Sequence, residues 1–174
     1  MAKTAAKKTT LRGADKKEAF HEAAEAKVHP FKFDLSDVNV PQDKKLHVKL
    51  AGTDSTRASV QILHEGDGNN LHYHPNMDLI YMVLKGCIRF YGPGDAILGE
   101  FKQNEGLLLP ENARYWFESV GKEEAWLLQI AGYPKGPKAV KRINVDAPKK
   151  SLGNAWIGLT DAEQKEMDRI VAGK

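Results

Sequence analysis

The chain has 174 residues, of which 41% are hydrophobic and 28% are charged, a balance that predicts one folded domain and excludes a largely disordered chain. Its net charge of +3 is small, although basic residues gather near the N-terminus and between residues 135 and 150. No nucleic-acid-reading motif accompanies these clusters, so we interpret them as a solvated tail and a solvated loop and expect no nucleic-acid partner.

The cysteine content and the apolar runs indicate the compartment. Cys87 is the single cysteine, which excludes an intramolecular disulfide and suits a reducing compartment, by default the cytoplasm. No apolar run approaches the ~18 residues of a membrane-spanning helix, and the first residues lack the apolar stretch of a secretory signal. We therefore expect neither export nor a membrane partner.

The N-terminal region is predicted to contain one helix. Residues 1–13 are rich in Ala, Lys and Thr with almost nothing to bury, which predicts a mobile basic tail. Residues 14–44 are expected to form a helix near residues 15–28 and then an extended arm. Asp15 as N-cap with Glu18 three residues on is typical of a capping box, and Pro30 ends the helix.

The middle of the chain is predicted to be a β-domain over residues 45–134. Short runs with period-two alternation or β-rich composition are separated there by turn-forming residues. The runs are 45–51, 57–64, 70–74, 79–85, 87–91, 106–110, 113–119 and 125–131. No helical pattern interrupts them, which excludes a parallel sheet with crossover helices and favours an antiparallel sandwich or barrel. Residues 135–174 are expected to form an arm and a terminal helix that begins near Thr160.

Two histidines at strand spacing are the first candidates for chemistry. Residues two apart in a strand share a face, so His72 and His74 would point the same way, with Tyr73 opposite. Their nitrogens could converge on one metal ion. Histidine pairs also occur as ordinary polar surface, so the spacing alone leaves both interpretations open.

The sequence around this pair resembles the first motif of the cupin family, in which glycine, His-x-His, glutamate and a second glycine recur at fixed spacing. Gly66, His72, His74 and Gly86 fall in register with it. The second cupin motif is matched in outline by residues 104–119. Pro110 is in place there, and the other motif positions hold Asn104, Asn112, Tyr115 and Ser119. The resemblance implies an all-β jelly-roll barrel with short flanking helices and a site inside one mouth of the barrel.

The departures from the family pattern concern the metal ligands. A typical cupin binds Fe, Mn, Zn, Ni or Cu through three histidines and one glutamate, and of this set only His72 and His74 remain. Leu79 stands at the glutamate position. Its neighbour Asp78 reaches the cavity only if it precedes the strand or a bulge re-aims it, and is otherwise an exposed carboxylate in a turn.

Tyr115 stands at the third histidine position, and several roles are open to it. It could bind a strongly acidic metal as phenolate, act as a general acid or hydrogen-bond donor to substrate, or form an aromatic wall. The resemblance thus implies a divalent metal, Zn, Fe, Mn or Ni, held by His72 and His74 with Tyr115 or Asp78 as a third ligand, or else a site that works without metal.

Strand parity predicts the remaining lining of the pocket. If position 79 faces inward, positions 81 and 83 do too, and position 117 follows position 115. The predicted substrate-binding residues are Leu79, Tyr81, Val83, Phe117 and Gln129, with Trp126 as an alternative wall. Parity alone leaves open whether Gln129 faces the cavity or solvent. Such a lining suits a small, partly apolar molecule.

Two functions are favoured by the sequence, with a structural or storage role as a third alternative. One is a cupin enzyme that acts on a small oxygenated substrate by metal-assisted isomerase, lyase or decarboxylase chemistry, with Tyr115 and Asp78 as catalytic groups and dioxygenation less favoured. The other is a non-catalytic cupin that binds a small ligand without a functional metal. The resemblance also implies a homodimer, and residues 29–40 and 151–158 are apolar enough to pack on a neighbouring subunit.

Overall fold

The computed structural model describes residues 13–28, 30–36, 44–134, 142–146 and 153–157. The chain divides into two compact units, residues 1–32 and residues 33–174, and each is described by itself. In the first unit, helix α1 spans Gly13–Glu25, so the predicted helix is present but ends three residues earlier than expected. The predicted mobile tail up to residue 12 and the predicted C-terminal helix lie outside the described residues.

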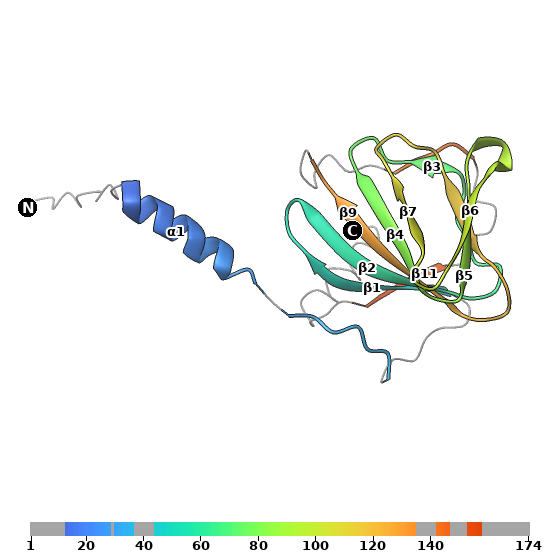
Figure 1. Cartoon of the computed structure of the whole chain (residues 1–174), viewed down its shortest axis with the longest axis horizontal. Coiled ribbons are helices and arrows are strands. Elements are labelled where there is room, and N and C mark those ends of the chain that lie inside the picture. The colour runs from blue at the N-terminus through green and yellow to red at the C-terminus, as the bar shows by residue number, and fades with distance from the viewer. Residues whose placement is uncertain (1–12, 29, 37–43, 135–141, 147–152, 158–174) are drawn as a thin grey trace, which may run out of the picture. The chain divides into compact units, whose positions relative to one another are not determined.

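The second unit is built from strands in three sheets (Figure 1). The strands are β1 (Lys44–Gly52), β2 (Thr56–Leu63), β3 (His72–Tyr73), β4 (Asp78–Lys85), β5 (Cys87–Tyr91), β6 (Ile97–Lys102), β7 (Gly106–Leu109), β8 (Trp116–Ser119), β9 (Ala125–Gly132), β10 (Ile143–Asn144) and β11 (Gly153–Ile157), with a 3₁₀ turn at Pro93–Asp95. The eight predicted runs all correspond to strands. Strand β6 was not predicted, because its apolar residues Ile97, Leu98 and Phe101 do not alternate with polar ones.

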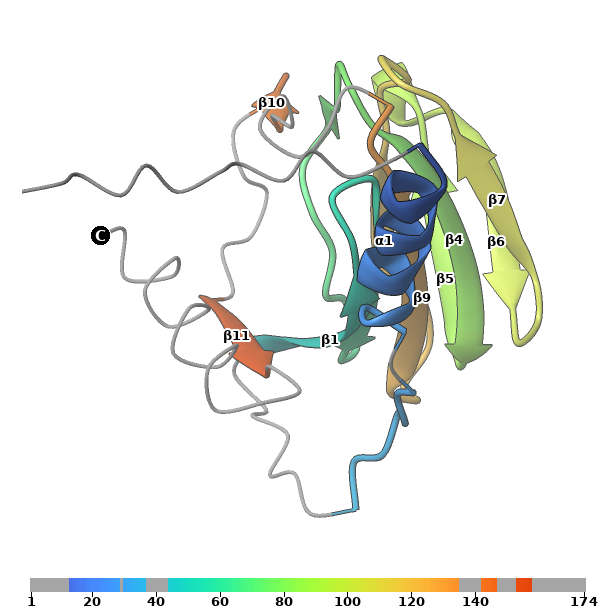
Figure 2. The ribbon, with the colours of Figure 1, turned by 90° about the vertical axis from the view of Figure 1, so that its left-hand side faces the viewer.

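The sheet order is that of a jelly-roll barrel. The largest sheet has the order β11-β1-β2-β9-β4-β7, the second β6-β5-β8, and β10 pairs with β3. The pairs are antiparallel, as predicted, except that β11 runs parallel to β1. Residues 153–157, predicted to pack on a neighbouring subunit, therefore extend the sheet of their own chain beside β1 (Figure 2).

Backbone conformation supports the register of both cupin-like motifs. Gly66 and Gly86 of the first motif have φ of 72° and 73°, the left-handed region that glycine adopts readily. The glycine positions of the second motif hold Asn104 and Asn112, with φ of 69° and 68°. Asparagine is among the few other residues that tolerate this region, so both substitutions keep the turns that the motif requires.

Two apolar clusters cover the two faces of the large sheet. The interior cluster lies between the sheets and includes Leu79, Val83, Phe90 and Leu127. The outer cluster joins residues of β1 and β2 to Trp126, and Phe33 and Leu35 from the arm pack on it. These two residues, which belong to a segment predicted to contact a neighbouring subunit, thus cover part of their own barrel.

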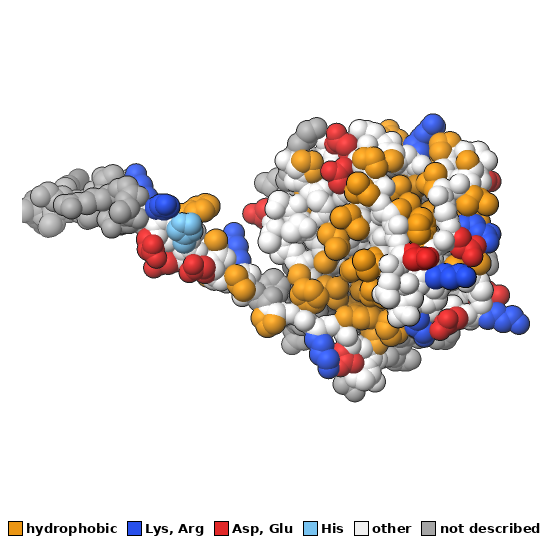
Figure 3. Space-filling view, in the orientation of Figure 1, with side chains coloured by type: hydrophobic (Ala, Val, Ile, Leu, Met, Phe, Trp, Pro, Cys, Tyr) orange, Lys and Arg blue, Asp and Glu red, His pale blue; other side chains and the backbone are white. Residues whose placement is uncertain are grey.

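Part of the outer face remains apolar and exposed. Ile80, Met82, Leu108 and Ile130 are exposed, and Ile80 lies between Leu108 and Ile130 in register. Hydrophobic side chains are visible on the barrel surface in Figure 3. Such surface is common where proteins associate, but the homodimer itself stays a prediction. Among the described residues, no helix is long and apolar enough to cross a membrane.

The first prediction concerns the interior cluster. The Phe90 side chain is 0% exposed and packs its ring near those of Tyr81 and Phe117. Phe90→Ala leaves a cavity and is expected to lower the free energy of unfolding by about 3–5 kcal/mol. Denaturant unfolding measures this loss. The control Leu108→Ala removes a side chain that is 63% exposed and is expected to cost less than about 0.5 kcal/mol; equal losses in the two variants would contradict the assigned core.

Candidate functional site

The site begins with a backbone connection between the two motif segments. His72 N donates to Tyr115 O at 3.1 Å, and Tyr115 N donates to His72 O at 2.9 Å, a closely paired antiparallel bridge. The two rings lie with their centroids 4.4 Å apart. The structure therefore brings Tyr115, 43 residues further along the chain, against the first histidine of the pair, where the resemblance placed a third ligand.

The imidazole of His72 is buried and held in one tautomer. Its side chain is only 2% exposed, and Nδ1 lies 2.7 Å from the carbonyl oxygen of Asn70. A carbonyl can only accept, so Nδ1 carries the proton and Nε2 keeps its lone pair. Desolvation, helped by the positive charge of Arg142, lowers the pKa of His72 from 6.5 to about 3. The ring is neutral at physiological pH.

His74 completes the predicted pair. Its ring centroid lies 5.1 Å from that of His72 and 6.4 Å from that of Tyr115, and its side chain is partly buried. The backbone of this residue is fixed by Asn112 N, which donates to His74 O at 2.9 Å. The two imidazoles and the phenol thus form one aromatic cluster on the inner side of the barrel.

Two buried phenols stand next to the imidazoles. The hydroxyl oxygens of Tyr81 and Tyr115 are 3.1 Å apart, and both side chains are almost fully buried. Desolvation raises the pKa of Tyr81 to about 12 and the pKa of Tyr115 well above its usual value. Both phenols are therefore neutral. When one donates to the other, the hydrogen of the acceptor phenol is still able to donate elsewhere.

The amides of Gln61 and Gln129 extend this polar group. Gln61 Nε2 donates to Gln129 Oε1 at 2.8 Å, and Gln61 acts on the Tyr81 phenol to offset part of the rise in its pKa. Gln129 lies opposite Tyr81 in the pairing of β4 with β9, so it faces the interior. Gln61 was not predicted. It lies two residues after Ser59, which pairs with Gln129, so it shares the inner face of β2.

The predicted lining residues lie on the barrel interior with one exception. Leu79, Val83 and Phe117 are at most 1% exposed and belong to the interior cluster with Tyr81. Trp126, named as an alternative wall, belongs to the outer cluster, where its ring contacts that of Phe33 at a centroid distance of 5.2 Å. The interior therefore offers an apolar surface with polar groups at a few points, although its contacts with a substrate stay a prediction.

Asp78 lies outside this interior. Its side chain is exposed, and Oδ1 accepts from Glu111 N at 2.8 Å. The carboxylate therefore stabilises the turn at the start of β4. Of the two positions that the sequence left open for Asp78, in the cavity or exposed in a turn, the structure has the exposed one. Its expected roles as metal ligand and catalytic group find no support in this geometry, because Asp78 is exposed while the next residue of the strand, Leu79, is the one buried in the interior.

The donor set does not complete the metal site that the family pattern implies. No group of three or more His, Cys, Asp or Glu side chains converges within the described part of the chain. His72 Nε2 and His74 could supply two ligands, but Leu79 is buried at the glutamate position and the Tyr115 phenol is neutral and hydrogen-bonded. Protein metal sites usually have at least three protein ligands, so we derive no chemical step through a metal.

Sequence reasoning missed two basic residues near the site. Arg142 Nη2 donates to Asn70 Oδ1 at 2.6 Å, and Asn70 also positions the His72 ring. Arg142 belongs to a basic cluster that the composition indicated to be a solvated loop, so nothing in the sequence pointed to it. The second is Lys45 on β1, which is 8% exposed. The only sequence signal for its inward orientation was its alternation with the apolar Leu46.

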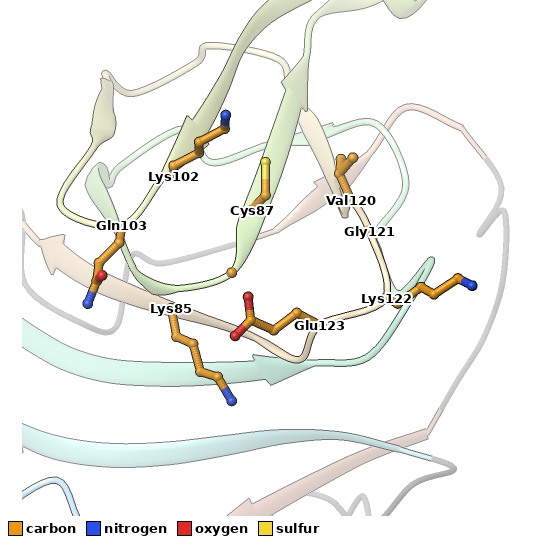
Figure 4. Close-up of a pocket in the computed structure, with 9 residues that line it drawn as sticks. Lys85, Cys87, Lys102, Gln103, Val120, Gly121, Lys122 and Glu123 are labelled. Carbon is orange, nitrogen blue, oxygen red and sulfur yellow. The ribbon is translucent and has the colours of Figure 1, made fainter.

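A hollow of about 430 Å³ lies at the opposite end of β4. It is lined around the turn at Gly86 by residues that include Cys87, Lys102 and Lys122, and it contains none of the cluster described above. Figure 4 shows the lysine side chains pointing away from one another. The ammonium of Lys85 lies 3.9 Å from Glu124 Oε1, so these charges do not converge on one ligand.

The low pKa of His72 makes a prediction about stability. In the unfolded chain His72 binds a proton near pH 6.5, whereas in the folded chain it binds one only near pH 3. The contribution of His72 to the free energy of unfolding is therefore fully present above about pH 6.5 and is lost as the pH falls toward 3. By about pH 5 the free energy of unfolding is lower by about 2 kcal/mol. His72→Gln should remove that part of the pH dependence in denaturant unfolding, whereas His21→Gln, at an exposed position of α1, should retain it. An unchanged slope in His72→Gln would contradict the buried neutral ring.

Comparisons with known proteins agree with this fold. No family model matches the chain. A Streptomyces cyaneus protein named polyketide synthase CurC is 27% identical over 103 residues, which are 59% of this chain and 58% of that protein, so the match spans little more than half of the relative.

Solved structures are similar at lower identity. A Klebsiella pneumoniae protein with a double-stranded β-helix domain matches with a TM-score of 0.56 and 12% identity, over 67% of this chain and 92% of that one. An RmlC-like cupin from Desulfovibrio desulfuricans matches with a TM-score of 0.52 and 17% identity, over 60% and 97% of the two chains. Together with the sheet order, these likenesses show that the chain has the cupin-type barrel fold that its first motif implied.

Proposed function

We propose that the protein is an enzyme that moves a proton on a small, partly apolar carbonyl compound, in isomerase or lyase chemistry. The observation that carries this proposal is the state of the His72 ring, which is a neutral imidazole whose Nε2 is unprotonated and can accept a proton. This ring lies beside the neutral phenols of Tyr81 and Tyr115, inside an apolar barrel. Buried polar groups cost stability, and such clusters are found preferentially at functional sites.

The proposed roles follow from the protonation states. A phenol of the Tyr81–Tyr115 pair donates a hydrogen bond to the substrate carbonyl oxygen and stabilises the negative charge that develops there. His72 Nε2 accepts the proton from the adjacent carbon, and the electron pair of the broken C–H bond moves into the carbonyl group. Return of the proton to another carbon completes an isomerisation; loss of a leaving group from the neighbouring carbon completes an elimination.

The choice of a carbonyl substrate has two supports. The phenols are hydrogen-bond donors that remain neutral, which suits an oxygen acceptor better than a cation. The Streptomyces cyaneus relative is named a polyketide synthase, and polyketides carry ketone groups whose neighbouring C–H bonds are acidic. The apolar residues around the cluster, among them Leu79, Val83 and Phe117, match the carbon part of such a molecule.

The alternative is a protein that binds such a molecule without catalysis. Leu79 favours it, because a buried aliphatic side chain occupies the position where the family carries a ligating glutamate. Dioxygenation is not part of the proposal, since the exposed position of Asp78 leaves a two-histidine-one-carboxylate set unassembled among the described residues.

Hydrogen exchange at carbon tests the proposal without knowledge of the natural substrate. Neutral ketones and hydroxyketones, beginning with hydroxyacetone and phenylacetone, are incubated with the protein in D₂O, and deuterium uptake beside the carbonyl is followed by ¹H NMR. The protein is expected to accelerate uptake for at least one compound. His72→Gln and Tyr115→Phe should each lower that acceleration by about 10²–10⁴-fold, the usual contribution of a general acid or base.

Asp78→Asn is the matched control, because its side chain lies on the same strand as Tyr81 but outside the interior. It should exchange at the wild-type rate. Compounds that bind, detected by shifts of their NMR signals, but never exchange faster than in buffer would overturn the enzyme proposal in favour of the binding protein. Loss of exchange in Asp78→Asn would contradict the assignment of the site to the interior.

A further inference from the structure

Lys45 is a buried cation on the inner face of the barrel. Its neighbour Leu46 belongs to the outer cluster, and adjacent strand residues face opposite sides, so Lys45 faces inward, with 8% of the residue exposed. Desolvation lowers the pKa of the ammonium. The carboxylate of Asp67 is the negative group that acts on it.

Arg142 brings a second positive charge to the same region. Its guanidinium donates to Asn70 Oδ1 at 2.6 Å, and Asn70 O holds the His72 ring at 2.7 Å. The charge of Arg142 acts on the ammonium of Lys45, on His72 and on the phenols of Tyr81 and Tyr115. The amide oxygen of Asn70 is a neutral acceptor, so this hydrogen bond does not balance the charge of the guanidinium.

The charges that the structure describes around His72 and Lys45 therefore do not cancel. Within this described part, Lys45 and Arg142 contribute two positive charges and Asp67 contributes one negative charge. The Asp67 carboxylate is also engaged by the backbone, because its Oδ2 accepts from His64 N at 2.9 Å. A cation held away from water is costly unless an anion accompanies it. Lys45 is buried, whereas Arg142 is exposed. An incoming anion would therefore meet unbalanced positive charge, and its attraction to Lys45 would be strengthened by the low dielectric constant around that buried ammonium.

We propose that a small organic anion, a carboxylate, binds beside His72, between the buried ammonium of Lys45 and the exposed guanidinium of Arg142. This inference rests on the proposed function and makes it more specific, because the substrate then carries a carboxylate in addition to its carbonyl group. The two cations fix the carboxylate end, and the carbonyl group lies toward the phenols. Negative charge that develops on the carbonyl oxygen during proton transfer is stabilised by the same two cations.

Benzoate and benzamide provide a direct test, because they have nearly the same shape and differ in charge. Each is titrated into the full-length protein, and the dissociation constant is measured by NMR shifts of the protein. Benzoate is expected to bind at least tenfold more tightly than benzamide. Lys45→Met and Arg142→Met should each weaken benzoate binding at least about tenfold, the scale of a lost charge-assisted hydrogen bond, and leave benzamide binding unchanged.

Lys102→Met is the control, since this lysine is exposed on β6 and lies at the hollow at the other end of β4. It should bind benzoate as the wild-type protein does. Thermal unfolding checks each variant, and Lys45→Met should be at least as stable as the wild type because it removes a desolvated charge. Arg142→Lys, which keeps the charge, should retain most of the affinity for benzoate.

The outcomes separate this inference from the proposed function. Equal binding of benzoate and benzamide, or benzoate binding that Lys45→Met and Arg142→Met leave intact, would overturn the anion site. The exchange experiment uses neutral ketones and depends on His72 and Tyr115, so its result would be unaffected by that failure. Tight benzoate binding with no exchange of any ketone would support the anion site and overturn the catalytic proposal alone.

Discussion

The backbone bridge between His72 and Tyr115 is the interaction on which the site depends. Its two hydrogen bonds, at 3.1 and 2.9 Å, hold the segment around the two-residue strand β3 against the segment that leads into β8. Through this bridge the imidazole meets the phenol, and through Asn70 the imidazole acquires its tautomer and its link to Arg142. Without it, the chemical groups would lie on separate loops of the barrel.

The interior of the barrel contains both apolar side chains and buried polar groups. Apolar residues such as Phe90 and Leu127 supply the core, yet the same space contains two phenols, two amides and a neutral imidazole. These polar groups satisfy one another through the hydrogen bonds of Tyr81 with Tyr115 and of Gln61 with Gln129. Because each has a partner, the cost of burial is limited. Because those partners are neutral, the cluster does not balance the charges of Lys45 and Arg142.

Much of the fold could be predicted because strands and turns are local signals. The alternation in residues 57–63 and 79–85 indicated β2 and β4, and the glycine positions of the motifs fixed two turns, which Asn104 and Asn112 preserve with positive φ. Strand β6 was missed because alternation is absent there, and β11 because pairing with β1 across about a hundred residues leaves no local trace. The inward orientation of Gln129 required the register of β4 with β9, which parity alone could not supply.

The candidate site could be predicted only as far as strand parity and motif spacing reach. They placed His72, His74 and Tyr115 together, as the ring distances show, but left open whether Asp78 preceded the strand, or was re-aimed by a bulge, and so reached the cavity. Asp78 is the first residue of β4, is exposed and accepts a hydrogen bond from Glu111 N. Arg142 and Lys45 carry no motif and were indistinguishable from solvated lysines and arginines elsewhere. The burial of Lys45 and the hydrogen bond of Arg142 to Asn70, a residue distant in sequence, are features that only the folded chain reveals.

The central claim is that His72 is a neutral imidazole with its proton on Nδ1 and its lone pair on Nε2. Nitrogen-15 NMR of histidine-labelled protein, with His72 assigned by its absence in His72→Gln, measures this directly. The account predicts a protonated Nδ1 and an unprotonated Nε2 at neutral pH, unchanged when the pH is lowered to about 5. A proton on Nε2, or a ring that titrates near its ordinary pKa of about 6.5, would contradict it.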